Sequence, residues 1–187
     1  MSSQSRLRRL FSPKSVAVIG GGVWCRSVIE QLFKIDYKGK IFPVHPSKKE
    51  ILGLKYFKDL EAVPANIDAS FVGVNRNTTI EVVKKLNELN AGGAVCFASG
   101  FLEAENDKQG SGELQKILIE AAGDMPILGP NCYGFINYLD RSVLWPDQHG
   151  GKPVDRGVAI LTQSSNLAIN ITTVSYTHLT LPTIYSV

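Results

Sequence analysis

The chain has 187 residues, of which 44% are hydrophobic and 20% charged, a composition that is ordinary for a globular protein. A net charge of +3 without a dense basic face excludes a nucleic-acid-binding protein, and no apolar run approaches the ~18 residues of a membrane span. Three widely spaced cysteines, and an N-terminus without an apolar signal core, favour the reducing cytoplasm and offer no zinc site.

The N-terminal region predicts an arm, a strand, a glycine turn and a helix. We expect residues 1–13 to form an arm in which SRLRRL is a solvated helix end. The run KSVAVIG, residues 14–20, is a predicted buried strand that ends in the first of three successive glycines. On the helix that follows, the predicted apolar face consists of Val28, Ile29, Leu32 and Phe33.

Two further apolar runs predict the next strands. They are KIFPV, residues 40–44, and DASFVGV, residues 68–74. Pro43 falls near the end of the first run, where a strand does not need another hydrogen-bond donor.

The helix after the third strand has signals at both ends. Thr78 and Glu81 have the spacing of a capping box, and Gly92-Gly93 follow its last apolar position. Its predicted apolar positions recur at helical spacing and are Ile80, Val83, Leu86 and Leu89.

A fourth strand at residues 91–99, a helix at residues 112–122 and a fifth strand at residues 126–129 continue the alternation. Strands that alternate with helices through short links predict a parallel sheet covered on both faces. With right-handed crossovers, residues 14–143 should form a doubly wound, Rossmann-like α/β domain.

Ligands of a doubly wound sheet bind outside the carboxyl ends of its strands. We therefore expect the five loops that follow the strands to meet at one crevice. In chain order, these loops carry Gly20-Gly21-Gly22, His45-Pro46-Ser47-Lys48, Asn75-Arg76-Asn77, Ser99-Gly100-Phe101 and Pro130-Asn131-Cys132.

The C-terminal part departs from this domain. Residues 144–156 are rich in proline and glycine and predict a linker. Residues 157–173 repeat the strand–turn–helix pattern and predict the start of a second, truncated α/β domain. Residues 174–187 abandon that pattern, and VSYTHL is what a transposon-end adapter of sequencing libraries would encode, so we expect a non-native tail.

The glycine turn fits a dinucleotide poorly. The G-x-G-x-x-G fingerprint needs a third glycine where this chain has Cys25, and NAD favours a carboxylate at the end of the second strand, where this chain has His45. Lys48 and Lys49 follow closely. Glycine amides, a helix N-terminus and a nearby lysine suit a ligand with an extra ribose phosphate, either NADP or coenzyme A.

Six stretches occur in a fixed order: LRRLFSPKSVAVIG, GKIFPVHPSKKEILGLKYF, DASFVGV, ASGFLEA, ILGPNCYGFIN and GVAILTQSS. Together they resemble the N-terminal CoA-binding domain of NDP-forming acyl-CoA synthetases, the acetate–CoA ligase family, to which the succinyl-CoA synthetase alpha subunit is related. The resemblance covers roughly residues 6–171. The second and fifth stretches are specific together, whereas the first strand alone is not.

The resemblance implies that this domain binds CoA. The glycine turn from Gly20 to Val23 would lie against the phosphates, and the loop with Pro43, His45 and Lys48 would reach the adenosine phosphate. The rest of the ligand would be lined by Val74, Asn75, Ser99, Gly100 and Asn131.

The family joins a small carboxylic acid to CoA through an acyl phosphate and a phosphohistidine. The resemblance implies that the full-length parent uses ATP or GTP with magnesium, contains an ATP-grasp module in cis or in trans, and is oligomeric. It also implies that residues 157–173 begin a flavodoxin-like domain, in which Ser164 and Ser165 start a phosphate-binding helix. The phosphohistidine segment is missing, so we expect no catalytic residue and no metal site in this fragment. The sequence has three histidines, and none of them matches the family's phosphohistidine: His45, His149 and His178.

Two positions depart from the family pattern. Trp24 stands beside the glycine turn and would alter how CoA enters, and Ser165 replaces a more usual glycine. For the other reactive or aromatic side chains we expect structural roles. Cys96 is assigned to the core, Cys132 to a turn, His149 to the linker surface, Glu103 and Glu105 to solvent, and Tyr133 and Trp145 to packing.

Our hypothesis is a CoA-binding fragment of an NDP-forming acid–CoA ligase that does not complete catalysis alone. Two alternatives stay open. An NADP-dependent oxidoreductase domain is disfavoured by the missing third glycine. A stand-alone CoA- or nucleotide-sensing regulator would be excluded by a continuation with a glycine-flanked histidine and an ATP-grasp module.

Overall fold

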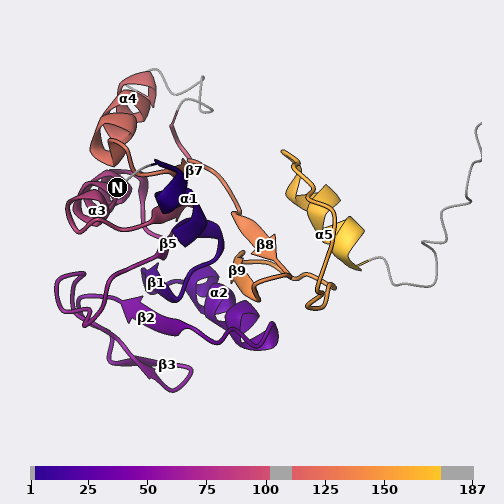
Figure 1. Cartoon of the computed structure of the whole chain (residues 1–187). Coiled ribbons are helices and arrows are strands. Elements are labelled where there is room, and N and C mark those ends of the chain that lie inside the picture. Colours follow the sequence, from indigo (N-terminus) through magenta and orange to yellow (C-terminus); the bar gives the residue numbers. More distant parts are fainter. Residues whose placement is uncertain (1–2, 102–110, 174–187) are drawn as a thin grey trace, which may run out of the picture.

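A five-stranded parallel sheet forms the centre of the computed structural model, which describes residues 3–101 and 111–173 (Figure 1). Its strand order is β2-β1-β5-β6-β7, and neighbouring strands are parallel throughout. This confirms the predicted Rossmann-like, doubly wound fold. The strands are β1 (Ser15–Ile19), β2 (Lys40–Val44), β5 (Ala69–Val72), β6 (Gly93–Cys96) and β7 (Ile127–Leu128).

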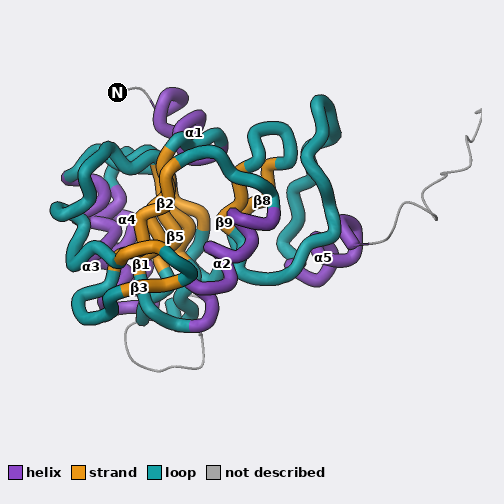
Figure 2. The backbone as a smooth tube through the Cα atoms, turned by 90° about the horizontal axis from the view of Figure 1, so that it is seen from below, coloured by secondary structure: helices purple, strands orange, loops and turns teal. Residues whose placement is uncertain are grey.

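Both faces of the sheet are covered, as its uninterrupted apolar strands require (Figure 2). Helix α2 (Val23–Lys34) and the antiparallel hairpin of β8 (Phe135–Asn137) and β9 (Ser142–Leu144) pack on one face with Val16 and Val18. Helices α3 (Arg76–Glu88) and α4 (Ser111–Ala122) pack on the other face with Ala17 and Ile19. The sides switch between β1 and β5, which is where a doubly wound sheet opens its ligand crevice.

The buried stripe of α2 differs by one residue from the predicted face. Val28, Ile29 and Leu32 are buried as expected, but Phe33 is 49% exposed, so that part of the prediction is wrong. Cys25 takes its place, because positions 25, 28, 29 and 32 share one side of a helix with 3.6 residues per turn.

Helix α3 begins and ends earlier than predicted. Asn75 is its N-cap, and the Asn75 Oδ1 accepts a hydrogen bond from the Thr78 backbone N–H at 3.0 Å. Thr78 therefore lies inside the helix, and the predicted capping box with Glu81 is wrong. The chain turns at Asn90, which has a φ of 54°, and Gly93 already belongs to β6.

The N-terminal helix α1 (Ser3–Phe11) is part of the fold, although a solvated helix end was expected. Leu10 is fully buried, and Arg6 is buried beside it. The Arg9 Nε donates to the Asp68 Oδ1 at 2.7 Å, just before β5. The two arginines bury their aliphatic stems because each guanidinium finds a partner, the Asn87 Oδ1 in the case of Arg6.

In chain order, the hairpin of β3 (Glu50–Ile51) and β4 (Leu54–Lys55) comes after β2 and before β5, and helix α5 (Ser165–Thr173) is the last described element. The predicted helix of the C-terminal part is therefore confirmed. Its predicted strand is wrong: residues 157–162 form no strand, and Val158 and Leu161 are about nine-tenths exposed. The division into a linker and a second domain stays a prediction.

Three of the expectations fall outside the described residues, namely the solvated carboxylates Glu103 and Glu105, the tail at 174–187, and His178 within that tail. None of the helices in the described ranges is long and apolar enough to cross a membrane.

Candidate functional site

The glycine turn after β1 can be built only from glycine at its first position. Gly20 has a φ of 125°, and a Cβ added there would lie 2.6 Å from the Gly73 carbonyl oxygen and 2.9 Å from the Cys25 Sγ. Gly73 follows β5, so the turn sits at the point where the strand order reverses. Gly20 therefore lets the loops after β1 and β5 touch.

Cys25 packs its thiol against the glycine turn, at the position where a dinucleotide fingerprint has its third glycine. Its thiol lies 3.5 Å from the Ile19 carbonyl oxygen, and burial raises the pKa of Cys25 to about 11. Gly22 caps α2 without a side-chain hydrogen bond, and Gly22 and Val23 are exposed. The first turn of α2 therefore presents backbone N–H groups at the surface of the turn.

The loop after β2 reaches the glycine turn directly. The Lys48 Nζ donates to the Gly21 carbonyl oxygen, and a Cβ at Gly21 would lie 2.7 Å from the His45 ring. The His45 Nδ1 accepts from the Ser47 and Lys48 backbone N–H groups, each at 3.2 Å, which fixes the ring. The structure thus brings His45 and Lys48 against the glycines, whereas Pro43 is buried inside β2 opposite Val18.

The loops after β5 and β6 are joined by Arg76, the first residue of α3. Its Nη1 donates to the Gly100 carbonyl oxygen at 2.8 Å. Asn75 is exposed, but its Oδ1 is engaged as the α3 cap, which leaves its amide N–H groups for a ligand. Val74 is half-buried, and Ser99 is exposed at the same edge. Arg76 belongs to a loop that was predicted to meet the crevice, but no role of its own was predicted for it.

The loop after β7 is tied to the loop after β6. The Asn131 backbone N–H donates to the Ala98 carbonyl oxygen at 2.9 Å, and the Cys132 N–H donates to the Cys96 carbonyl oxygen. Asn131 has a φ of 54° and an exposed side chain. Burial raises the pKa of Cys132, as expected of a turn residue and unlike an activated nucleophile.

The five strand-ending loops therefore form a connected edge, from His45 and Lys48 at one end to Asn131 at the other. Ser164 and Ser165 belong to a different part, at the start of α5, which lies beside the β8–β9 hairpin (Figure 1). The Ser164 Oγ accepts from the Leu167 backbone N–H at 3.2 Å and so caps α5.

Aromatic rings gather near the carboxyl ends of β6 and β7, at one end of the row of strand-ending loops. Trp24, in the first turn of α2, lies with its ring centroid 5.4 Å from that of Phe97, and Phe97 lies 5.6 Å from Tyr133. Tyr133 in turn lies 5.1 Å from Trp145, which is buried, so the predicted packing role of the last two rings is borne out by their contacts.

His149 is not the surface histidine that the sequence predicts. Only 2% of it is exposed, and its Nδ1 lies 3.1 Å from the Tyr138 hydroxyl oxygen. Lys34, at the end of α2, donates to the His149 carbonyl oxygen. Burial, with the Lys34 charge nearby, lowers the pKa of His149 to about 4, so the ring is neutral at pH 7.

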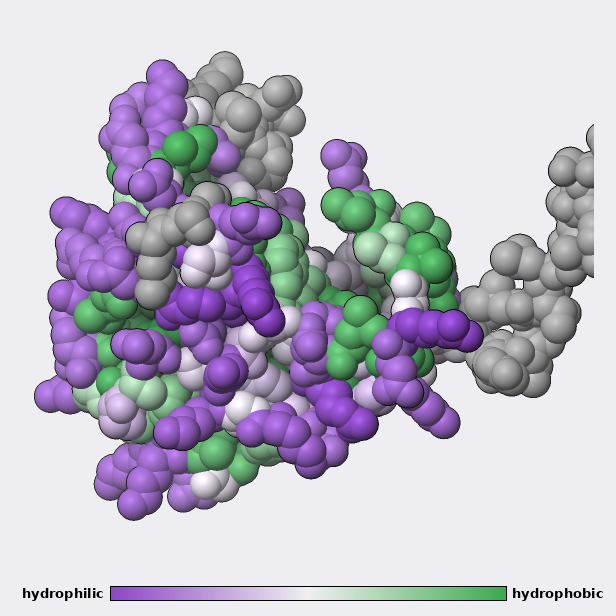
Figure 3. Space-filling model, viewed as in Figure 1, coloured by the Kyte–Doolittle hydropathy of each residue, from purple (hydrophilic) through white to green (hydrophobic). Residues whose placement is uncertain are grey.

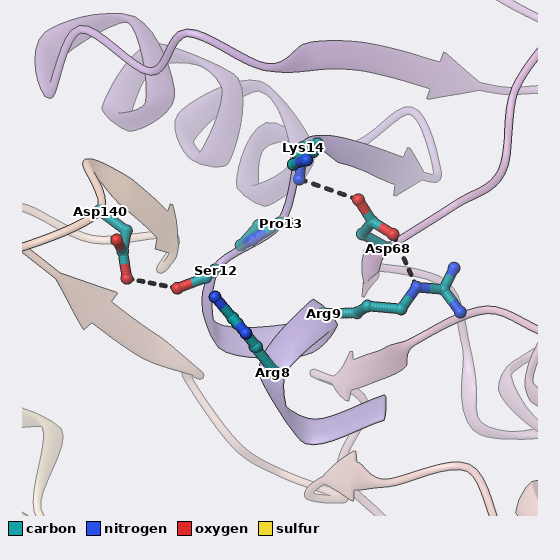
Figure 4. Close-up of a pocket in the computed structure, with 7 residues that line it drawn as sticks. All are labelled: Arg8, Arg9, Ser12, Pro13, Lys14, Asp68 and Asp140. Atoms are coloured by element: carbon teal, nitrogen blue, oxygen red, sulfur yellow. Dashed lines mark hydrogen bonds and ion pairs between the residues drawn. The ribbon is translucent and has the colours of Figure 1, made fainter. Parts of the chain in front are cut away.

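A second feature, a hollow of about 690 Å³, lies at the opposite, amino edge of the sheet (Figure 4). Several of the polar groups that line it bind one another: Asp68 accepts from the Arg9 Nε and from the Lys14 backbone N–H, and Ser12 donates to Asp140. These interactions attach α1 to the amino edge of the sheet, and the hollow lies away from the glycine turn. In the parts of the chain that the structure describes, no cluster of His, Cys, Asp and Glu could hold a metal ion.

Known proteins resemble this chain in sequence and in fold. The family model described as a CoA binding domain matches residues 14–138. The chain is 33% identical over 178 residues to a trans-feruloyl-CoA synthase of an unknown prokaryotic organism, covering 91% of this chain and 25% of that protein. It is 30% identical over 132 residues to the alpha subunit of an ADP-forming acetate–CoA ligase of Pyrococcus furiosus, covering 68% of this chain and 28% of that subunit.

Among solved structures, the chain is similar to the dinucleotide-forming acetyl-coenzyme A synthetase 1 of Ca. Korarchaeum cryptofilum in its apo form. The TM-score is 0.69 at 28% identity, over 78% of this chain and 32% of that one. The chain thus spans about a third or less of each of these proteins.

Proposed function

The chain belongs to the CoA-binding domain family, and from this we propose that it supplies the CoA site of an NDP-forming acid–CoA ligase. It is homologous to ADP-forming acetate–CoA ligases over part of their length. We further propose that the parent uses ATP or GTP with magnesium in an ATP-grasp module, in cis or in trans. A relative named as a subunit supports an oligomeric parent, and three free thiols support the cytoplasm.

The observation that carries the proposal is the contact of Lys48 with the glycine turn. It places an ammonium group beside exposed backbone N–H groups, which together suit two phosphates rather than one. We assign the pyrophosphate of CoA to Gly20, Gly21, Gly22 and the start of α2, and the 3′-phosphate to Lys48 with His45. Val74, Asn75, Ser99, Gly100 and Asn131 would line the path of the pantetheine arm.

The test is a calorimetric titration of the whole chain with CoA, dephospho-CoA, NAD and NADP. We expect CoA to bind most tightly. Lys48→Ala should weaken CoA about tenfold, since one charge-assisted contact contributes roughly 1.4 kcal/mol, and should change dephospho-CoA much less. Lys49→Ala is the matched control, because Lys49 is also exposed but has no contact with the glycine turn in the described hydrogen bonds.

Binding of NADP without CoA would overturn the proposal and favour an oxidoreductase domain. If Lys48→Ala weakens the affinities for CoA and dephospho-CoA equally, the assignment of the 3′-phosphate to Lys48 is wrong. The proposal for the parent is tested by the rest of the gene. If the gene encodes no ATP-grasp module and no partner protein supplies one, a stand-alone CoA-sensing regulator is favoured.

A further inference from the structure

We propose that the aromatic rings beside β6 and β7 select an aromatic acyl group on the CoA thiol, with Trp24 as the specificity-determining residue. We call these rings the aromatic row, defined as Trp24, Phe97, Tyr133 and Trp145. The inference rests on the proposed function, because it assigns the far end of the same ligand.

The direction of the ligand follows from where the charges lie. Lys48 and His45 follow β2, at one end of the sheet, and the glycine turn follows β1. With the phosphates there, the pantetheine arm leaves toward β5 and β6, the next strands in the order. Strands are about 4.8 Å apart, so β6 lies roughly 10 Å from β1, a span that an extended arm can cross. The thiol end therefore arrives at Phe97, directly after β6.

The aromatic row is held in place from behind. The Phe97 backbone N–H donates to the Val72 carbonyl oxygen at 3.2 Å, and its ring also packs on the buried Phe71 at 5.6 Å between centroids. Tyr133 is supported by Trp145, of which only 5% is exposed. Phe97 and Tyr133 therefore pack on the buried rings of Phe71 and Trp145, which restricts their movement.

Trp24 differs from the other members because 45% of it is exposed. It stands at the start of α2, between the glycine turn and Phe97, with its ring tilted by 50° to the Phe97 ring. An indole that contacts one ring and is nearly half exposed offers surface to a planar group. Aromatic pairs gain from offset or edge contacts beyond the area that they bury, and an acetyl group has no such contact to make.

The chain itself provides the test and its control. We would titrate the full 187-residue chain with CoA, acetyl-CoA and benzoyl-CoA, as wild type, Trp24→Ala, Trp24→Phe and Phe33→Ala. Phe33 is the matched control, because it lies on the same helix and is 49% exposed, but at the end of α2 away from the glycine turn.

We expect the wild type to bind benzoyl-CoA about tenfold more tightly than acetyl-CoA, equivalent to roughly 1.4 kcal/mol. Trp24→Ala should bring this ratio to about one while CoA and acetyl-CoA change less than twofold. Trp24→Phe should keep most of the preference, and Phe33→Ala all of it.

The outcomes separate this inference from the proposed function. CoA binding with no preference for benzoyl-CoA overturns the inference alone. Equal weakening of all three ligands by Trp24→Ala also overturns it, because Trp24 would then contact the common part of the ligand, such as the adenine. If none of the three ligands binds, both proposals fail.

Discussion

At the residue scale, His149 shows how a buried contact can reverse a prediction made from composition. Its neighbours in the sequence are Gly150 and Gly151, which is why the segment predicts an exposed linker. In the structure a Cβ at Gly151 would run into the Tyr138 ring, so the glycine is there for close packing rather than for flexibility. This packing buries His149 between α2 and the β8–β9 hairpin.

The buried imidazole makes a prediction about pH. The unfolded His149 titrates near 6.5 and the folded one at about 4, so the unfolded state binds more protons between these values and stability falls as the pH falls. We expect the chain to lose about 2 kcal/mol between pH 7 and pH 5 from this group alone. Urea unfolding at both pH values, for the wild type and for His149→Asn, measures it.

His149→Asn keeps an acceptor for the Tyr138 hydroxyl but cannot be protonated, so its stability should change much less over this range. Lys34 on α2, which donates to the His149 carbonyl oxygen, is the same in both proteins. An identical loss of stability in both proteins would show that the ring is not the group that titrates.

The candidate site combines residues that the sequence locates with side chains whose partners it does not show. Loops that follow parallel strands can be located from the sequence, and Gly20, His45, Lys48 and Asn131 do lie on the connected edge. The sequence could not show which side chains are already occupied, because that depends on neighbouring loops. Asn75 is the clearest case, since its side-chain oxygen is already engaged as the cap of α3.

At the scale of elements, the side-chain cap of α3 should contribute to stability. Asn75→Ala should destabilise the chain by about 1 kcal/mol, because it removes the side-chain acceptor of the Thr78 N–H. Asn77→Ala is the control, since Asn77 is exposed within the first turn and alanine favours a helix. Thermal or urea unfolding of both variants would decide it, and a larger loss for Asn77→Ala would contradict the cap.

The same variant separates folding from binding. If Asn75 only caps α3, Asn75→Ala should bind CoA as the wild type does once it is folded. If its amide also contacts the ligand, affinity should fall further than that of Asn77→Ala at the same fraction of folded protein.

The elements that could be predicted are those whose pattern is local. Each strand of the central sheet is a short apolar run, and α2, α3 and α4 have apolar residues at helical spacing. The hairpin of β8 and β9 was missed, since its pairing of Phe135 with Leu144 spans a loop without a strong turn signal. Helix α1 was found as a helix but not as part of the fold, because its partner Asp68 is 59 residues away.

At the scale of the whole molecule, the buried apolar residues are concentrated in the part of the chain that forms the central sheet and its helices. The two core clusters contain residues from Leu10 to Trp145, and only Ala168 and Ile169 of α5 pack against them. Residues 157–162 carry a strand-like sequence but no strand, and apolar surface gathers over the segment that carries α5 (Figure 3). An isolated strand cannot satisfy its backbone hydrogen bonds, so a sequence of this kind needs neighbouring strands before it orders.

Truncation of two leucines, one exposed and one buried, should have very different effects on stability. Leu161 is 94% exposed, whereas Leu144 is fully buried in β9 against α2. Leu161→Ala should change the free energy of unfolding by less than about 0.5 kcal/mol, as surface substitutions do. Leu144→Ala should lower it by about 2–5 kcal/mol, because it removes buried methyl groups and leaves a cavity. Urea unfolding of both variants measures the difference. A loss of several kcal/mol from Leu161→Ala would place residues 157–162 inside the core, whereas the expected result leaves their apolar side chains to be covered by a larger protein, as the proposed second domain requires.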